Sequence, residues 1–253
     1  MKTLSFIGSG NVATHLAKAF FSKGYTIVEI CSRTLANAQA LAAKVGAKSI
    51  TNLKMLEKAD VYIIAVNDKA INSIVEAMPS TTALVLHTAA SEAMHVLRKF
   101  DNYGVLYPLQ TLHRDGSADM STVPFLIEAD REENLTIVAD LAASLSSSIY
   151  NMDSAHRRKL HLAAVFAGNF VNSLLAFSKD IAGDDFLLME PLVRNTVEKA
   201  FQAPHPKEVQ TGPAIRGDVE TINKHLSMLN DRPRLHEAYR LLSTIIIAMT
   251  NEQ

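Results

Sequence analysis

The sequence is poor in the residues that mark several classes of protein. Cys31 is the one cysteine among 253 residues, which excludes an internal disulfide or a cysteine-rich zinc site, and we expect no metal centre. Ten glycines and eight prolines are too few for a collagen-like or low-complexity chain. The 25 basic and 26 acidic residues give a net charge of −1, which argues against a nucleic-acid-binding surface.

Targeting and membrane segments are also not expected. The start of the chain is strand-like and runs directly into a glycine turn, unlike a secretory signal with its basic flank and apolar stretch. We identify no stretch of about 18 uncharged apolar residues of the kind that spans a bilayer. The sequence therefore predicts a cytoplasmic protein that does not associate with membranes.

Hydrophobic residues make up 48% of the chain, and their spacing changes near residue 152. Before that point, short β-branched runs alternate with amphipathic helical segments, and Val61–Val66 is typical of a strand buried on both faces of a parallel sheet. After it, every periodic segment is helical, including one long helix over residues 155–179. We predict a doubly wound parallel α/β domain over residues 1–152 and an all-helical domain over 153–253.

A glycine-rich turn follows the first predicted strand. Residues 8–13, GSGNVA, fit the pattern G-x-G-x-x-G/A between a strand and a helix. The first glycine permits the tight turn, the second lets the backbone approach a pyrophosphate, and the final alanine allows close helix–strand packing. The pyrophosphate would rest on the free N–H groups of the helix. The motif predicts a Rossmann-type domain whose cofactor contacts come from Gly8, Ser9, Gly10, Asn11 and Val12.

The end of the second predicted strand distinguishes the two nicotinamide cofactors. A carboxylate there would bind the ribose 2′-hydroxyl of NAD, but Glu29 falls too early within the strand. Arg33 can pair with a 2′-phosphate, and Ser32 and Thr34 can donate hydrogen bonds to it. We therefore predict NADP as the cofactor. The alternative is that Arg33 is a solvated loop residue and that Ser32 or Thr34 caps a helix.

Polar side chains follow the next strands, where parallel sheets bind their ligands. Val66 and Asn67 are expected to border the nicotinamide ribose, while Asp68 either lies there too or caps the next helix. His87 at the end of the fourth strand is either a proton donor or a buried core residue. The same rim carries further candidates for substrate contacts or orientation: Thr88, Ser91 and, within YPLQT of residues 107–111, Gln110.

The helical half has polar positions of its own. His161, Asn169 and Asn172 lie on an otherwise apolar segment, and the two asparagines, three residues apart, share a face of the predicted helix. A buried asparagine needs a hydrogen-bonding partner, which is either the substrate or another helix. Arg216 lies in the segment TGPAIRGD, where two glycines and a proline restrain the loop, and its guanidinium can pair with a substrate carboxylate. The alternative is an ordinary surface arginine.

These motifs resemble a known family, the Rossmann-like oxidoreductases with an all-helical C-terminal domain of unknown function. The family is related to pyrroline-5-carboxylate reductase, to 6-phosphogluconate and 3-hydroxyisobutyrate dehydrogenases, and to F420-dependent NADP reductase. The resemblance implies NADP(H) binding, a helical domain that often dimerises, and an active site between the domains. It is carried by GSGNVATHLA (8–17), CSRT (31–34), HTAAS (87–91), YPLQT (107–111), HLAAVFAGN (161–169) and TGPAIRGD (211–218).

The chain also departs from its relatives. Hydroxyacid dehydrogenases place a lysine shortly before an asparagine on the first interdomain helix, whereas Val165 and Phe166 stand before Asn169 here. Histidine is then the side chain in the expected cleft that ordinarily titrates near neutral pH, and we predict His161, or else His87, as the proton donor.

The sequence thus predicts an NADP-dependent oxidoreductase acting on a small carboxylate-bearing imine, ketone or alcohol in an interdomain cleft. Asn169 and Ser91 would orient the reacting polar group, and Arg216 would hold the carboxylate. The broad apolar surface of the last predicted helix indicates a homodimer formed by the helical domain. Because the lysine is missing, a non-catalytic NADP-binding sensor or interaction protein is the alternative.

Overall fold

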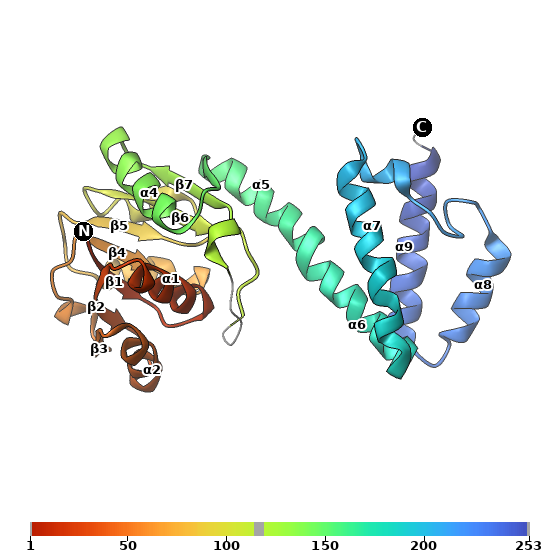
Figure 1. Ribbon diagram of the computed structural model, residues 1–253, viewed down its shortest axis with the longest axis horizontal. Coiled ribbons are helices and arrows are strands. Elements are labelled where there is room, and N and C mark those ends of the chain that lie inside the picture. Colours follow the sequence, from red (N-terminus) through yellow and green to blue (C-terminus); the bar gives the residue numbers. More distant parts are fainter. Residues whose placement is uncertain (1, 114–118, 252–253) are drawn as a thin grey trace. The chain divides into compact units, whose positions relative to one another are not determined.

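The computed structural model describes residues 2–113 and 119–251, and side chains as far as residue 249 (Figure 1). The chain divides into two compact units, residues 1–169 and 170–253. Each unit is considered by itself, and the domain limits expected from the sequence, 1–152 and 153–253, stay a prediction.

The first unit is built on one sheet of eight strands in the order β3-β2-β1-β4-β5-β6-β7-β8. The strands are β1 (Thr3–Ile7), β2 (Thr26–Cys31), β3 (Lys48–Ile50), β4 (Val61–Ile64), β5 (Leu84–His87), β6 (Tyr103–Pro108), β7 (Phe125–Ala129) and β8 (Ile149–Asn151). The Rossmann-type fold class is therefore confirmed. The sheet is parallel except where β7 runs antiparallel to β6, because the described part of their connection holds a single helical turn and no crossover helix.

Helices cover both faces of this sheet. On one face α1 (Asn11–Ser22), α2 (Leu35–Val45) and α4 (Glu132–Leu145) bury a core that includes Phe6, Leu16 and Phe20. On the other face α3 (Ile71–Ala77) and the 3-10 turn Met94–Leu97 pack on residues such as Ile64 and Val85. Strands β1, β4 and β5 are buried on both faces, which explains their continuous apolar sequences.

One helix leaves the last strand of the sheet. The carboxylate of Asp153 accepts a hydrogen bond of 2.7 Å from the backbone N–H of His156 and so caps α5 (Ser154–Ala164). The helix then continues as a π-helical segment, Val165–Phe170. The unbroken α-helix expected over 155–179 is therefore wrong in detail, because the wider turn of the π segment shifts the helical phase before residue 171.

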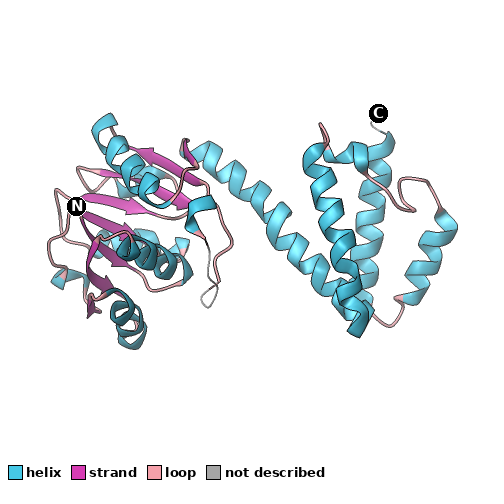
Figure 2. Cartoon of the chain, in the orientation of Figure 1, coloured by secondary structure: helices cyan, strands magenta, loops and turns pink. Residues whose placement is uncertain are grey.

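The second unit is all-helical, as Figure 2 shows in cyan. Its helices are α6 (Val171–Ala182), α7 (Glu190–Gln202), α8 (Val219–Met228) and α9 (Pro233–Asn251), with a 3-10 segment Gly183–Met189 before α7. The pair α8 and α9 is joined by a hydrogen bond of 2.7 Å between His225 Nδ1 and the Tyr239 hydroxyl. Few apolar side chains of this unit are buried, and the three among residues 170–249 are Ala214, Ile222 and Leu229.

One helical stretch in the described chain, Ser154–Gln202, is long and apolar enough to cross a membrane by length and composition. None of the residues in its most apolar window is buried. Residues 160–178 contain no Asp, Glu, Lys or Arg, and their apolar side chains outweigh the scattered His, Asn and Ser in the mean hydropathy. The expectation that no such segment exists is thus wrong, although a single helix of this kind is weak evidence for a membrane span.

Candidate active site

Gly8 occupies a position that only glycine can fill. Its φ is +122°, and a Cβ there would overlap the carbonyl oxygen of Ala65, just beyond β4. The Gly8 N–H donates to the carbonyl of Cys31 at 2.8 Å, which ties the turn to the end of β2. The turn is therefore closed tightly against two neighbouring strands, as the motif predicts.

Gly10 faces open space. A Cβ built on it meets no atom within 4 Å, and as the N-cap of α1 it leaves the helix without a side-chain cap. Uncapped N–H groups at the positive end of a helix bind anions. The first turn of α1 carries no acidic residue that would oppose one. These features fit the pyrophosphate of a dinucleotide.

Residues that follow this turn make hydrogen bonds to the segment after β6 that the sequence did not predict. The Asn11 side chain donates to the carbonyl of Leu112 at 2.8 Å, so it fastens the segment after β6 to the start of α1. His15 makes a parallel contact of 2.8 Å to the carbonyl of His113. Val12 is half-buried against the core. Phosphate contacts from Asn11 and Val12 are therefore expected from the backbone.

The residues predicted to bind the 2′-phosphate on the ribose of the cofactor follow directly after β2. The hydroxyls of Ser9 and Ser32 are hydrogen-bonded at 2.8 Å, which joins the glycine turn to this segment. Arg33 and Thr34 are exposed. Thr34 occupies the N-cap position of α2, but its side chain makes no cap hydrogen bond. The hydroxyl of Thr34 and the guanidinium of Arg33 thus remain exposed beside the turn.

The ends of β4 and β5 are joined by a pair of polar side chains. The Asn67 side chain accepts from the N–H of Lys69 at 3.1 Å and so caps the turn Asp68–Ala70. Asp68 is therefore not the cap, and its carboxylate instead accepts a hydrogen bond from the Ser91 hydroxyl. This contact places a carboxylate at the edge of the sheet where the cofactor motif lies. Val66, next to Asn67, lies close to Gly8.

A second pair joins β6 to α5. The Tyr107 hydroxyl and His161 Nδ1 are 3.1 Å apart, and the two half-buried rings meet edge to face. Burial raises the pKa of the Tyr107 phenol, as does the nearby carboxylate of Asp68, whereas Arg157 opposes the shift. Sequence reasoning placed Tyr107 only on the rim. The signal that could have singled it out was a tyrosine ending a buried strand.

His87 lies in the core. It is fully buried, its Nδ1 accepts a hydrogen bond of 3.1 Å from the N–H of Ala89, and Thr88 beside it is also buried. Burial, and then the positive charge of Arg157, lower the pKa of His87 to about 3. The imidazole is therefore neutral at neutral pH, which favours the buried core residue over the proton donor.

Four predicted residues remain: Gln110, Asn169, Asn172 and Arg216. Gln110 is exposed, and its side-chain oxygen accepts from the N–H of Thr111 at 2.8 Å. Asn169 is exposed within the π-helical segment. Asn172 and Arg216 are exposed in the second unit, so their expected contacts with substrate stay predictions.

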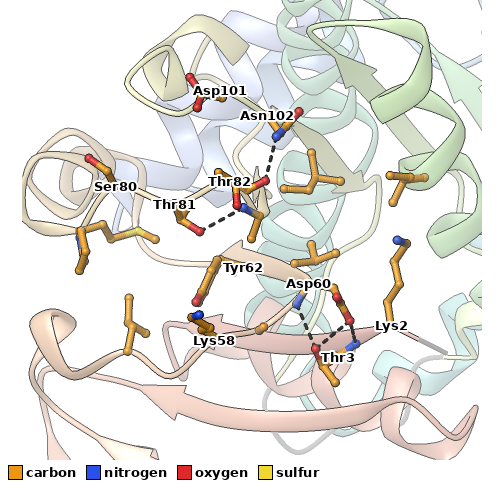
Figure 3. A pocket seen from close by; sticks show the side chains of 18 of the residues that line it. Lys2, Thr3, Lys58, Asp60, Tyr62, Ser80, Thr81, Thr82, Asp101 and Asn102 are labelled. Carbon is orange, nitrogen blue, oxygen red and sulfur yellow. Dashed lines mark hydrogen bonds between the residues drawn. The ribbon is translucent and has the colours of Figure 1, made fainter.

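A pocket of about 970 Å³ opens at the opposite edge of the sheet, around the amino ends of β4 and β5 (Figure 3). It contains none of the predicted site residues. Several of its polar groups are already paired, including the Asp60 carboxylate with the Thr3 hydroxyl at 2.8 Å and the Asn102 side chain with the carbonyl of Thr82 at 2.8 Å. Ligands of such sheets bind at the carboxyl ends of the strands, so the site lies at the other edge.

Known proteins match both parts of this architecture. Residues 3–91 match the family described as NADP oxidoreductase coenzyme F420-dependent, and residues 123–246 match the domain of unknown function DUF2520. A crystal structure from Bacteroides fragilis, of a protein assigned as an NADP oxidoreductase, is 39% identical, with 98% of each chain covered and a TM-score of 0.89. The chain belongs to this NADP oxidoreductase family. The resemblance drawn from the sequence motifs is confirmed, and the protein is an NAD(P)-dependent oxidoreductase.

More distant structures share the fold. An imine reductase from Myxococcus stipitatus in complex with NADP+ is 17% identical, with 99% of this chain and 93% of that chain covered and a TM-score of 0.68. A pyrroline-5-carboxylate reductase from Coxiella burnetii is 16% identical, with 99% and 98% covered and a TM-score of 0.57. No curated protein matches the chain.

Proposed function

We propose that this oxidoreductase uses NADPH to reduce the carbon–nitrogen double bond of a small, carboxylate-bearing imine. The observation that carries the proposal is the Asp68 carboxylate, bound by Ser91 at the carboxyl ends of β4 and β5. A protonated imine is a cation, and a carboxylate beside it stabilises that charge, whereas a ketone offers no charge to stabilise. Of two proteins with the same fold, one is named as a reductase of imines and the other as a reductase of pyrroline-5-carboxylate.

We propose NADP rather than NAD as the cofactor. The exposed guanidinium of Arg33 and the hydroxyl of Thr34 lie where a 2′-phosphate is read in such sheets. A planar guanidinium binds phosphate with two parallel charge-assisted hydrogen bonds. Gly8, Gly10 and the uncapped start of α1 would hold the pyrophosphate. The bound cofactor supplies the hydride.

The residues of the second unit are assigned to the rest of the substrate. Arg216 would pair with the substrate carboxylate, and Asn172 would orient its polar groups. Asn169, Thr88 and Gln110 would be further contacts from the first unit. The cleft expected between the two halves is part of this proposal.

We also propose that the protein is a cytoplasmic homodimer formed through its helical unit. That unit buries few apolar side chains of its own, while Leu174, Ile181 and Phe201 are among those exposed. A surface of this kind is stable in water when another apolar surface covers it. A second copy of the same chain supplies one of identical composition.

Steady-state oxidation of NADPH with a panel of small imines tests the proposed reaction. The panel pairs cyclic imines with and without a carboxylate, and adds the matching ketones, with the reverse reaction on alcohols measured with NADP+. We expect reduction of the imines, fastest for those with a carboxylate. Asp68→Asn should lower turnover without weakening NADPH binding. Reduction of ketones in preference to imines, or an unaffected Asp68→Asn variant, would contradict the proposal.

A further inference from the structure

We infer that Tyr107 is the catalytic residue that protonates the imine nitrogen, and that His161 resupplies its proton. The inference rests on the proposed function, since it assigns the acid for that reaction. The contact that carries it is the hydrogen bond of 3.1 Å between the Tyr107 hydroxyl and His161 Nδ1.

Three elements hold this pair in place. Tyr107 precedes the last residue of β6, at the edge of the sheet where Asp68 and Ser91 also meet. His161 lies on α5 (Figure 1), one turn after the fully buried Arg157, and residues four apart share a helix face. Arg157 binds the Glu128 carboxylate on β7, so the helix face that carries His161 is fixed against the sheet.

The protonation state of His161 decides where the tyrosine proton points. A neutral imidazole that accepts at Nδ1 takes the hydrogen bond from the phenol, whose proton is then directed at the ring. A protonated imidazole donates from both nitrogens, so its Nδ1–H points at the tyrosine oxygen. The phenol proton must then turn away from the ring, and it becomes available to a substrate nitrogen. Protonated His161 thus prepares Tyr107 as the acid.

The charged groups around the pair keep the phenol protonated. Asp68 from the end of β4 and the burial of the ring both raise the pKa of Tyr107. Arg157 on α5 acts in the opposite sense, but its charge is paired with Glu128 from β7. His87 at the end of β5 is neutral, with a pKa lowered to about 3. Tyr107 is therefore a phenol rather than a phenolate before it acts.

The proposed step balances in atoms and electrons. The imine nitrogen uses its lone pair to take the proton from Tyr107, which gives an iminium cation beside Asp68 and a phenolate. The iminium carbon accepts the hydride from the reduced nicotinamide cofactor, which is thereby oxidised, and the C=N π electrons become the nitrogen lone pair. The phenolate takes the proton from His161 Nδ1, which leaves a neutral imidazole that keeps its proton on Nε2, and Nδ1 is protonated again from solvent.

Two probes that differ only at nitrogen separate proton delivery from hydride transfer. The first is 2-methyl-1-pyrroline, assayed from acidic to alkaline pH and compared at equal concentration of its free base. The second is its N-methyl iminium salt, which needs no proton. Tyr107→Phe should lower turnover of the imine by about 10²–10⁴-fold and leave turnover of the salt unchanged. Tyr103→Phe, the same change at the other end of β6, is the matched control and should affect neither probe.

Further variants assign the two roles separately. His161→Gln should remove one limb of the pH profile for the imine and leave the profile for the salt unchanged, while NADPH fluorescence reports unaltered cofactor binding. Asp68→Asn should slow both probes, because both pass through a cation. Equal loss of both probes in Tyr107→Phe, or full retention of imine turnover, overturns the inference. Wild-type protein that binds NADPH but reduces neither probe contradicts the proposed function itself, and the inference with it.

Discussion

The Nη1 atom of Arg157 on α5 lies 2.5 Å from Oε2 of Glu128 on β7, and the arginine side chain is fully buried. A second nitrogen of the same guanidinium donates to the carbonyl of Glu92 at 2.7 Å and to the hydroxyl of Ser154 at 3.1 Å. The first helix after the sheet is thus fastened through one side chain to two other segments, β7 and the segment around Glu92. Loss of this connection should affect both stability and the position of His161.

Glu128→Gln should lower the free energy of unfolding by about 3–5 kcal/mol, because it leaves a buried guanidinium without its counter-charge. Urea denaturation of the full chain measures the change. The matched control is Glu237→Gln, which breaks the ion pair of 2.6 Å between Glu237 and Arg240 on the exposed face of α9. That variant should unfold like the wild type, because exposed pairs contribute little. Similar losses in both variants would refute a special role for the buried pair.

Two alanine substitutions in the glycine turn should affect different properties, one the stability of the fold and the other the affinity for NADPH. Gly8→Ala places a Cβ against the Ala65 carbonyl at a positive φ, so it should destabilise the fold and lower the melting temperature. Gly10→Ala meets no protein atom, so the melting temperature should stay unchanged while NADPH affinity falls. Scanning calorimetry and NADPH fluorescence titration measure the two properties. A Gly10→Ala variant that binds NADPH normally would place the pyrophosphate elsewhere.

Arg33→Ala should weaken NADPH binding by about 1.5–3 kcal/mol, the size of a charge-assisted contact, and leave NADH binding unchanged. The reason is that Arg33 is exposed beside the turn and meets only the 2′-phosphate in the proposed complex. Lys44→Ala, at the far end of α2, removes one positive charge as a control. Competitive titration measures the affinities for both cofactors. Equal losses of affinity for NADH and NADPH would show that Arg33 does not select between them.

Local pattern was enough to predict the framework of the first unit. The sequence predicts strands over 3–7 and 26–31 and a helix over 35–45, and β1, β2 and α2 have these bounds, because each has a strong periodic signal and a turn at either end. Strands β3 and β8 were missed, since three residues at the edge of a sheet carry too little hydrophobic alternation to stand out. Their existence depends on pairing with strands already formed, which no local window contains.

The candidate site was harder to predict for a related reason. The glycine turn is a local motif and was identified, whereas the pairs Asp68–Ser91 and Tyr107–His161 join residues 23 and 54 positions apart. For His87 the sequence left two roles open, proton donor or buried core residue, because a histidine at a strand end suits both until its burial is known. Spacing along the chain reports which residues share an element, and it does not report which elements meet.

Glu29→Gln should stabilise the protein at neutral pH by about 1 kcal/mol, the scale of an unsatisfied buried polar group. Glu29 is fully buried on β2, Oε1 accepts from the N–H of Glu57 at 2.8 Å, and no partner is recorded for Oε2 among the described residues. Burial raises the pKa of this carboxyl above its ordinary value of 4.5, although the Glu57 N–H opposes the shift. A glutamine keeps the acceptor and can donate to the buried hydroxyl of Ser5, its neighbour in register on β1.

The sign of the effect follows from proton linkage. A carboxyl whose folded pKa is raised binds a proton in the folded state that the unfolded state has already released. Its contribution to stability is therefore present below pH 4.5 and is lost as the pH rises through the raised value. The difference in unfolding free energy between variant and wild type should grow over that interval and then level off. A difference that does not change with pH would mean that Glu29 ionises normally in the fold.

The proposed homodimer predicts a sedimentation mass of twice 27.7 kDa at micromolar concentration. Leu241 and Ile245 lie one turn apart on α9 and are 52% and 46% exposed, which is unusual for large apolar side chains in a chain that exists alone. The double variant Leu241→Glu with Ile245→Glu should sediment as a monomer, because it inserts two charges that cannot be desolvated in an apolar interface. Ser227→Glu, at an exposed polar position of α8, adds charge to the same unit and should remain a dimer. A monomeric wild type, or wild-type protein that partitions into lipid vesicles while the double variant does not, would refute a second copy as the partner of this surface.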